Sequence, residues 1–484
     1  MARFYLRLEG VNLNRFVYDT TNLNAVRGGG LLLLDAPERV RERFNFDRVA
    51  TGASSGLYSF EADDITQAES VCKQVRDFLD QDSNYKHATF VVDILAAGDE
   101  EDFPIDHEKL LALNRWQQMN APSLAVPATN SGFHDPCEID LVRPAYRKRK
   151  IKIKGENKSV SRSIRQRVTY GRRKKQSFFE ERSGIRIPRH PAFAFDLDEL
   201  TSDEKQGLLN HKMAVIYLDG NGFGKIRDEI CKTREKLIEF DTRLKDGQKQ
   251  WLVSLIELME SEEGWISNKD RYRIEVLLWG GDEIIWVVPA WKGWQTLALL
   301  FETARSWEKF GDHRLTHAAG IVFCHHNAPI NRIKELVEKL ADLAKTKDRR
   351  SDLFAYEVLE SFDYVSGNLL DYRKERCPQP IDPDLDPDPS ILILSPDGME
   401  GIIAHARKLK DVIPRRKLTA IVRELLRKNP GEVRKKKLEN LDEELRSAIE
   451  SAGAKDSLKE ITSFFNKDKE ARWLHLDALW DYLD

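Results

Sequence analysis

The stretch Ile274-Glu-Val-Leu-Leu-Trp-Gly280-Gly281-Asp282-Glu283-Ile-Ile-Trp-Val-Val288 decides the fold of the second half of the chain. Two apolar runs flank Gly280-Gly281, and paired glycines between such runs predict a β-hairpin because they tolerate positive φ angles. Asp282 and Glu283 then stand at the exit of the turn. Adjacent carboxylates need hard cations or hydrogen-bond donors as partners, although solvated acids at an ordinary turn are the simpler reading.

A second cluster precedes this hairpin. Met213-Ala-Val-Ile-Tyr-Leu-Asp219 is typical of a strand that ends in a carboxylate, and it runs into Gly220-Asn221-Gly222-Phe223-Gly224-Lys225. Glycines let the backbone approach a ligand, and the N-terminus of the following helix supplies free N–H groups for phosphate. Lys225 could add positive charge, whereas Phe223 is expected to pack beneath the loop.

Residues 205–370 show the order of a β-α-β-β-α-β, ferredoxin-like domain. The predicted elements are strand 213–219, helix 224–262, strand 272–279, strand 284–289, helix 291–310, strand 315–323, helix 329–346 and strand 353–357. In this topology the first strand lies beside the hairpin, so Asp219 should meet Asp282 and Glu283. Three carboxylates suit two Mg²⁺ or Mn²⁺ ions, which could activate a hydroxyl and stabilise leaving pyrophosphate.

The other segments differ in character. Residues 1–118 are mixed α/β, with strands expected at Phe4–Leu8, Gly30–Asp35 and Ala88–Leu95 and a helix over 62–80. Residues 119–204 form a basic middle segment, 371–396 a linker and 397–484 a helical C-terminal domain. Lys and Arg recur from Arg143 to Arg189, which fits either a solvated linker or a surface for RNA or DNA.

The composition excludes several classes of protein. A net charge of −3 gives no global nucleic-acid signature, and five dispersed cysteines favour a reducing compartment without a disulfide framework. Neither a signal peptide nor a membrane span is indicated. We therefore expect a cytoplasmic protein that does not bind a membrane.

The two motifs resemble the palm domain shared by GGDEF diguanylate cyclases, class III nucleotide cyclases and the large subunit of type III CRISPR effector complexes. Asn221, the extra Gly224 and Ile284 depart from the GGDEF pattern. The CRISPR-type palm is closer: Leu315-Thr-His-Ala-Ala-Gly-Ile-Val-Phe323 resembles its fourth strand, and Leu340-Ala-Asp-Leu-Ala-Lys345 its last helix. That family usually carries Gly-Gly-Asp-Asp, so Glu283 is a conservative departure.

The resemblance extends to the N-terminal segment. Glu9-Gly-Val-Asn-Leu-Asn-Arg-Phe-Val17 is similar to the family's first palm strand, and Arg27-Gly-Gly-Gly30 to the helix-to-strand turn after it. The expected hairpin near Thr51–Tyr58 carries no carboxylates, which implies a degenerate first palm that closes the nucleotide cleft. The family's zinc module is not matched, because His134 and Cys137 are too few ligands for a structural zinc site.

The fold class is therefore α+β, with two ferredoxin-like palm domains, a basic middle segment and a C-terminal helical domain. The resemblance implies an ATP-using synthetase of cyclic oligonucleotides in antiviral defence, whose product a downstream effector senses. Asp219, Asp282 and Glu283 would be catalytic and, with Gly220, would hold the metals. The residues expected to bind nucleotide are Gly220, Asn221, Gly222, Phe223, Gly224, Lys225, Gly280, Gly281 and Lys345.

Two alternatives stay open. The chain could be an RNA-binding subunit of an RNA-guided complex, with a vestigial palm and with residues 143–189 on the RNA. It could also be a mononucleotide or dinucleotide cyclase of the GGDEF or class III type. Nucleotide turnover separates the first alternative from the synthetase, and the identity of the product separates the second.

Overall fold

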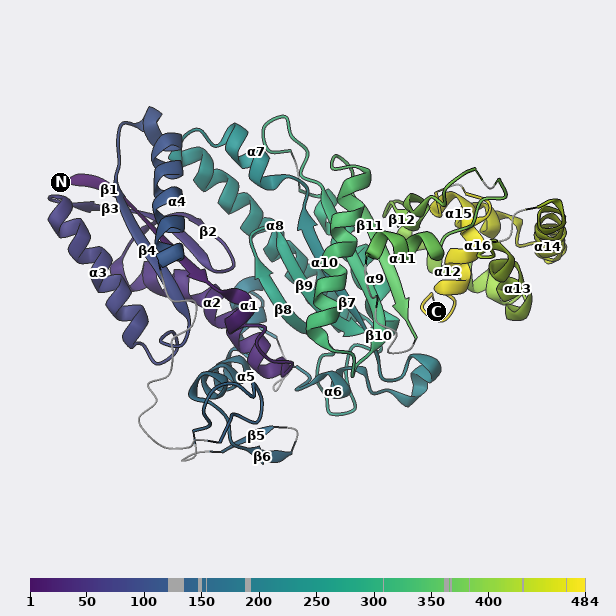
Figure 1. The fold of residues 1–484 in the computed structure, drawn as a ribbon, viewed down its shortest axis with the longest axis horizontal. Coiled ribbons are helices and arrows are strands. Elements are labelled where there is room, and N and C mark those ends of the chain that lie inside the picture. Colours follow the sequence, from purple (N-terminus) through teal and green to yellow (C-terminus); the bar gives the residue numbers. More distant parts are fainter. Residues whose placement is uncertain are drawn as a thin grey trace.

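Two β-sheets with their covering helices lie side by side, and a helical C-terminal part follows them (Figure 1). The structure is a computed structural model. It describes residues 1–120, 135–146, 150–153, 155–187, 193–307, 309–360, 365, 368–382, 384–428, 431–466 and 468–483.

The first sheet is antiparallel with strand order β2-β3-β1-β4. Its elements in chain order are β1 (Ala2–Val11), α1 (Leu13–Phe16), α2 (Leu23–Phe44), β2 (Asp47–Thr51), β3 (Ser55–Ala62), α3 (Ile65–Gln81), β4 (Thr89–Ala96), the 3₁₀ helix η1 (Glu100–Asp102) and α4 (Phe103–Asn120). Sheet order and chain order together are those of a ferredoxin-like unit.

The expected strand at Gly30–Asp35 is wrong. These residues lie inside the 22-residue helix α2, and the turn expected at Arg27–Gly30 is also helical. A short leucine run cannot be assigned to strand or helix by periodicity alone. The glycines serve helix packing, because a Cβ on Gly28 would lie 1.8 Å from the Arg167 carbonyl oxygen of α5 (Arg162–Ser183).

The second sheet has strand order β12-β11-β10-β7-β9-β8, with β10 and β11 parallel and the other pairs antiparallel. Its strands are β7 (Lys212–Gly220), β8 (Glu275–Gly280), β9 (Glu283–Pro289), β10 (His317–His325), β11 (Leu353–Leu359) and β12 (Ile393–Leu394). The ferredoxin-like core of the sheet places β7 between β10 and β9, as predicted.

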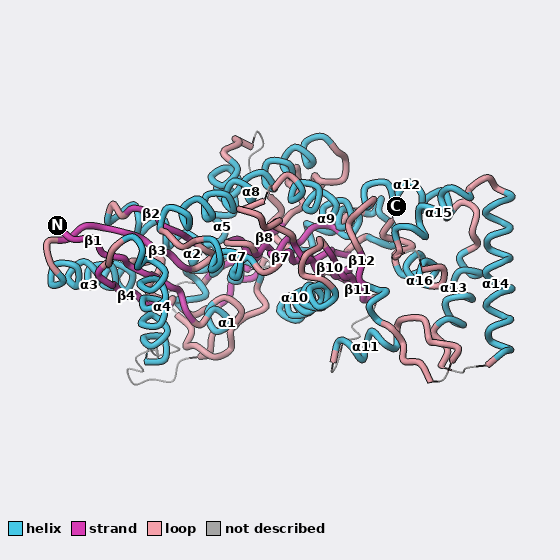
Figure 2. The backbone as a smooth tube through the Cα atoms, turned by 90° about the horizontal axis from the view of Figure 1, so that it is seen from above, coloured by secondary structure: helices cyan, strands magenta, loops and turns pink. Residues whose placement is uncertain are grey.

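Helices cover both faces of the second sheet. Figure 2 shows α8 (Arg234–Ser261) and α9 (Ala290–Arg305) on one face and α10 (Ile330–Lys347) on the other. The single helix predicted over 224–262 is wrong, because α7 (Phe223–Ile230) ends before Thr233 starts α8. The Thr233 hydroxyl caps the new helix by accepting a hydrogen bond from the Lys236 N–H at 3.2 Å.

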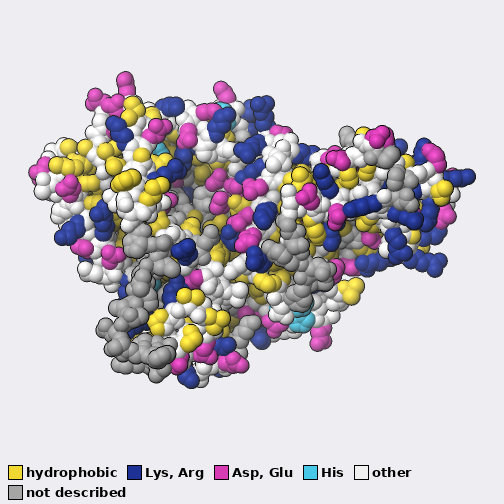
Figure 3. Space-filling model, viewed as in Figure 1, with side chains coloured by type: hydrophobic (Ala, Val, Ile, Leu, Met, Phe, Trp, Pro, Cys, Tyr) yellow, Lys and Arg dark blue, Asp and Glu magenta, His cyan; other side chains and the backbone are white. Residues whose placement is uncertain are grey.

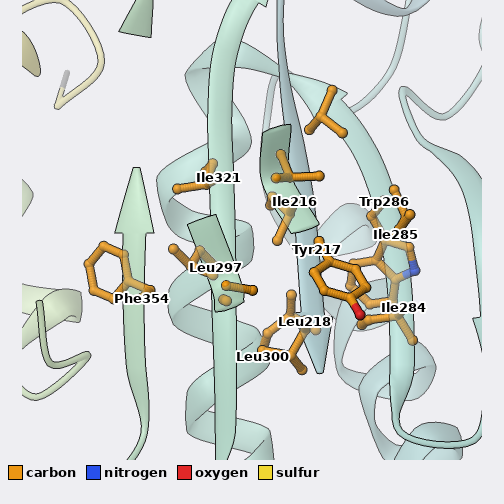
Figure 4. Packing of buried hydrophobic residues seen from close by; sticks show 14 of the residues in the cluster. Ile216, Tyr217, Leu218, Ile284, Ile285, Trp286, Leu297, Leu300, Ile321 and Phe354 are labelled. Carbon is orange, nitrogen blue, oxygen red and sulfur yellow. The ribbon is translucent and has the colours of Figure 1, made fainter. Parts of the chain in front are cut away.

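The core between these layers is apolar and continuous. Ile216 and Leu218 alternate with Tyr217 along β7, so they face the opposite side of the sheet. Figure 4 shows Ile216 and Leu218 together with Leu297 and Leu300 of α9 in this packing. The side chains of the two sheets belong to one buried cluster.

The basic middle segment is a structural element. It contains β5 (Ile151–Ile153), β6 (Glu156–Lys158) and α5, and α5 packs along α2. Arg167 is fully buried and donates to Asp19 at 2.8 and 2.9 Å, and Lys174 pairs with Asp35 at 3.0 Å. The solvated-linker interpretation is therefore wrong for the described part of this segment. Its outward basic residues stay a candidate surface for RNA.

The strands are followed by helices that pack against β11 and β12. The elements outside the two sheets are α6 (Leu197–Thr201), η2 (Glu204–Leu209), α11 (Leu369–Glu375), η3 (Pro389–Leu392), α12 (Met399–Lys410), α13 (Arg415–Leu425), α14 (Glu432–Ser451), α15 (Lys455–Phe464) and α16 (Ala471–Ala478). The Tyr356 hydroxyl of β11 lies 2.7 Å from His475 Nδ1 of α16, a buried contact between sheet and helices.

Among the described helices, none has the length and apolar character needed to cross a lipid bilayer. The predicted domain ranges stay predictions, although β12 lies within the range 371–396 expected to be a linker. His134 lies outside the described residues, and Cys137 is buried among apolar side chains of the middle segment.

Candidate active site

Two neighbouring strand ends carry the predicted acids. Leu218 of β7 pairs with Ile284 of β9, so Asp219 at the end of β7 lies beside Glu283 at the start of β9. Glu283 also closes the hairpin by pairing with Gly280. The adjacency of Asp219, Asp282 and Glu283 expected from the topology is thus present.

The acids influence one another. Burial and then the charge of Asp219 raise the pKa of Asp282 to about 7, and the same two causes raise the pKa of Glu283. Tyr217 faces the same side of β7 as Asp219. Burial and the charges of Asp219 and Glu283 raise the pKa of its hydroxyl. The cluster therefore has strong negative potential that favours a bound cation.

Lys345 supplies positive charge inside this cluster. It lies in the last turn of α10, and its ammonium group contacts Asp219 Oδ2 directly. Both side chains are largely buried, at 13% and 14% exposed. The resemblance predicts Lys345 near a triphosphate, and the structure places its ammonium group on Asp219, one of the three predicted acids.

The donor set fits the metals expected here. Asp219, Asp282, Glu283 and the Gly220 carbonyl offer only oxygen atoms, which Mg²⁺ and Mn²⁺ prefer. Burial and the charge of Asp219 raise the pKa of Asp282, so a nearby cation would favour its charged form. The carboxylate oxygens of the three acids do not all lie within 4.8 Å of one another.

The glycine-rich loop is held firmly on the sheet. Asn221 is buried; its N–H donates to the Thr316 carbonyl at 2.8 Å, and its side chain donates to the Ser351 carbonyl at 3.0 Å. Gly222 adopts φ 68° at the cap of α7, a left-handed conformation that suits glycine. The loop is thereby shaped before any ligand binds.

The side chains of Phe223 and Lys225 in this loop do not form a pair that faces a phosphate site. Phe223 is buried beneath Gly220, in edge contact with His317 at 5.2 Å between ring centroids. Its expected packing role is confirmed. Lys225 is 81% exposed and lies 3.6 Å from Glu229 one turn further along α7. Of the loop, the backbone is therefore the part best placed to meet phosphate.

The hairpin glycines bring the two sheets together. A Cβ on Gly280 would lie 2.4 Å from the Cα of Ala53, in the β2–β3 turn of the first sheet. Gly281 adopts φ 61°, and its carbonyl accepts a hydrogen bond from the Gln248 side chain at 2.6 Å. Both glycines set the position of the acid-bearing turn. The structure gives neither a separate nucleotide contact.

A cleft of about 230 Å³ opens between the two sheets at this turn. The first sheet and α4 contribute Arg7, Thr51 and His107, and the second contributes Arg227 and Asp282. Larger cavities of about 610 and 500 Å³ lie at the C-terminal helices, away from the acids. The smaller cleft lies between both sheets and reaches Asp282.

Comparison with known families decides the type of palm. Residues 212–354 match the family model described as Cas10/Cmr2, second palm domain. The chain resembles the Cas10-type large subunit. No curated protein matches the sequence.

Solved structures agree with the Cas10-type fold. Csm1 in T. onnurineus matches with a TM-score of 0.55 and 13% identity, covering 100% of this chain and 69% of that chain. A Csm1-Csm4 cassette in complex with AMPPNP matches with a TM-score of 0.47, 13% identity and coverage of 84% and 58%. For the apo Csm1-Csm4 cassette these values are 0.44, 12%, 72% and 53%. The present chain thus spans about half the length of the apo cassette chain.

Sequence reasoning missed several residues around the Cas10-type site. Glu338 of α10 adds negative charge beside Glu283 and Tyr217, and its partner Lys334 lies 4.6 Å from the Tyr18 ring of the first half. Helical spacing from Lys345 could have indicated Glu338, which lies seven residues earlier on the same helix face. The contact with Tyr18 has no local sequence signal.

Proposed function

We propose that this chain is a Mg²⁺- or Mn²⁺-dependent nucleotidyltransferase that converts ATP into cyclic oligonucleotides. The observation that carries the proposal is the meeting of Asp219, Asp282 and Glu283 at neighbouring strand ends of a palm of the Cas10/Cmr2 type. Among the described residues, Lys345 is the one cation paired with these acids, through Asp219, so further positive charge is needed to balance the other two. The three acids serve as ligands for the cations of a nucleotide site.

The protein's groups have distinct tasks in this reaction. Asp219, Asp282 and Glu283, with the Gly220 carbonyl, would hold two divalent ions, which neutralise charge on the reacting phosphate and on pyrophosphate. The N-terminus of α7 directs backbone N–H groups towards the triphosphate. Lys345 exchanges its contact with Asp219 for a phosphate oxygen, so that it binds the triphosphate when nucleotide is present and Asp219 when it is absent.

The bond changes follow from the substrate. A ribose hydroxyl oxygen of one ATP bonds to the α-phosphorus of a second ATP. The bond from that phosphorus to the α,β-bridging oxygen breaks, pyrophosphate leaves, and the hydroxyl proton passes to solvent. Repetition of this step and a final intramolecular step close the ring. The β2–β3 turn of the first sheet, at Ala53, closes the cleft opposite the acids.

The proposed product is a second messenger for a downstream effector in antiviral defence of the CRISPR type, and the protein would act in the cytoplasm. The resemblance to Cas10-type subunits supports partner subunits in an RNA-guided complex. Outward-facing basic residues of the middle segment would face RNA. Internal ion pairs of Arg167, Lys174 and Lys175 leave fewer charges for that surface.

The test is pyrophosphate release from each nucleoside triphosphate in Mg²⁺ or Mn²⁺, with and without added RNA. Release from ATP is expected in the wild type, and it should disappear in Asp282→Ala/Glu283→Ala. The control Glu443→Ala/Glu444→Ala removes two adjacent exposed acids from α14 and should retain release. Unchanged release in the first variant would contradict the proposal.

Two other results would favour the alternatives. Salt-sensitive RNA binding with no turnover of any nucleotide favours the binding subunit. Turnover of GTP, or a cyclic mononucleotide product, favours a cyclase of the GGDEF or class III type.

A further inference from the structure

A second cluster of ligand-type side chains lies at the opposite end of the second sheet from the acids. Lys212, the first residue of β7, pairs with His325, the last residue of β10. His211 directly precedes β7, His326 directly follows β10, and Asp198 lies on α6. Seven residues of strand separate Lys212 from Asp219, roughly 23 Å at about 3.3 Å per residue. This cluster is therefore separate from the candidate active site.

The three side chains converge on one point. His211 Nδ1 lies 3.4 Å and His326 Nε2 lies 3.7 Å from Asp198 Oδ1, and all three ligand atoms are within 4.8 Å of one another. Ligand atoms about 2.0–2.2 Å from a tetrahedral zinc ion are roughly 3.3–3.6 Å apart. The observed spacing needs little adjustment to enclose an ion.

The backbone prepares His326 for this role. Its Nδ1 lies 3.2 Å from the His211 carbonyl oxygen, which can only accept a hydrogen bond. Nδ1 must therefore carry the proton, and Nε2 presents a lone pair to the cluster. A backbone carbonyl that fixes the tautomer in this way is typical of histidines that bind metals.

The environment of His211 independently supports a role as a metal ligand. Its Nδ1 atom is buried and has no hydrogen-bond partner among the described atoms. Its backbone adopts φ 63°, which is uncommon for a residue other than glycine, and its N–H is held by the Thr201 carbonyl at 3.0 Å. His211 Nδ1 is thus buried in the cluster and lies 3.4 Å from Asp198 Oδ1 without a hydrogen bond.

The neighbouring side chains of Lys212 and His325 have other partners, so a cation can bind in the cluster. The nearby Lys212 ammonium is engaged by Glu360 at 2.6 Å and by the Tyr482 hydroxyl at 3.1 Å. His325 stacks on His326 at 4.5 Å between centroids. Figure 3 shows histidine side chains gathered at the surface near α6, so solvent ions can reach them.

We propose that Asp198, His211 and His326 bind one divalent transition-metal ion, with Zn²⁺ as its occupant. Two imidazole nitrogens and one carboxylate oxygen suit zinc and disfavour Mg²⁺, which prefers oxygen ligands alone. Water takes the fourth position. The ion joins α6 to the adjoining ends of β7 and β10. This proposal does not depend on the proposed nucleotidyltransferase activity.

The test is a Zn²⁺ titration of the full chain against a chromophoric chelator, with millimolar Mg²⁺ present to occupy the oxygen-rich site. One tight equivalent is expected in the wild type. His326→Gln and Asp198→Asn should each weaken it by at least about 100-fold, because removing a ligand costs no less than removing an outer partner. His313→Gln is the matched control, since His313 lies 3.5 Å from Glu229 elsewhere on the surface.

Cobalt gives a second readout on the same proteins. Co²⁺ in a site with two imidazoles and a carboxylate should show visible absorption in the wild type and in His313→Gln, and none in Asp198→Asn. Asp198 is exposed, so the asparagine variant should fold even if His326→Gln does not. Equal zinc affinity and equal cobalt spectra in wild type and Asp198→Asn would overturn the proposal.

Discussion

The two sheets have the same order of elements but different chemistry at equivalent turns. In the first sheet the β2–β3 turn carries Gly52, Ala53 and Ser54; in the second the β8–β9 turn carries Asp282, and Glu283 follows it as the first residue of β9. The two turns touch where Ala53 meets Gly280. Under the proposed function, the two copies of the fold divide one task, with the second copy holding cations and the first shaping the cleft.

The strand before each turn shows the same division. Both β1 and β7 lead into a short helix through a left-handed residue, Asn12 with φ 61° and Gly222 with φ 68°. Only β7 ends in a carboxylate that other acids surround. Glu9, near the end of β1, pairs with Arg7 at 2.8 Å instead.

The largest effect is expected at the strand ends, where an acid of the second sheet is compared with an acid of the first. Asp219→Asn should lower pyrophosphate release on the order of 10³-fold, since it removes a group that positions charge in the transition state. Glu9→Gln in the first sheet should leave release within about twofold, because surface ion pairs contribute little. Similar losses in both variants would place the active centre between the copies, not in the second.

The contact between the turns gives the next largest effect. Gly280→Ala places a Cβ 2.4 Å from the Ala53 backbone, so the two sheets must separate. Release should fall at least about 10²-fold, as expected when catalytic groups are displaced by about 1 Å. Gly401→Ala on α12 is the control, because no atom lies within 4 Å of a Cβ there and α12 lies away from the acids. Full activity of Gly280→Ala would show that the first turn has no part in the site.

A buried ion pair joins the two halves, and its loss should affect stability. Glu275 at the start of β8 accepts from Arg27 of α2 at 2.6 Å and from Lys175 of α5 at 2.8 Å, and all three are buried. Glu275→Ala should lower the free energy of unfolding by about 3–5 kcal/mol, because two buried cations lose their partner. Glu262→Ala, at an exposed pair with Lys292, should change it by under about 1 kcal/mol. Urea denaturation measures both, and equal midpoints would contradict the account.

Substitutions of one lysine on α10 and one on α7 distinguish the roles of these two helices in the second copy. Lys345→Gln should raise the KM for ATP by about 10–100-fold, the loss expected from one charge-assisted hydrogen bond of about 1.5–3 kcal/mol. Lys225→Gln should change KM by less than about twofold, because Lys225 is exposed and paired with Glu229. Steady-state kinetics check both, and a larger effect at Lys225 would reverse the assignment.

The smallest expected effect is the pH dependence of the acids. With a pKa of about 7, Asp282 must lose a proton before it binds a cation, so Mg²⁺ affinity should rise about tenfold from pH 6 to pH 8. Without metal, the free energy of unfolding has the opposite pH dependence. The raised pKa of Asp282 stabilises the fold at low pH, and this stabilisation is lost as pH rises through 7. Calorimetry should show both trends, and Asp282→Asn should abolish them. A flat profile in the wild type would contradict the raised pKa.

Local patterns predicted the second copy well. Alternating apolar strands and a two-glycine turn fixed the hairpin, and the ferredoxin-like order then placed Asp219 beside it. Lys345 was found through the resemblance, although its contact with Asp219 was not. A contact between charged groups far apart in sequence depends on how α10 packs over β7, which no local pattern records.

The failures come from tertiary packing. Gly30–Asp35 was predicted as a strand because a buried helix is apolar on all sides, and the glycines that precede it allow the close approach of α5. The basic residues of α5 read as solvated because Asp19, Asp35 and Glu275 lie far away in sequence. The cluster of Asp198, His211 and His326 was missed for the same reason, although the pair His325-His326 was visible.

The most direct test of the account is mass spectrometry of the products formed from ATP, in parallel for the wild type and for Asp282→Ala/Glu283→Ala. The wild type should yield cyclic oligoadenylates together with pyrophosphate, and the variant should yield neither. Cyclic products from the variant would contradict the assignment of the active centre to the second copy.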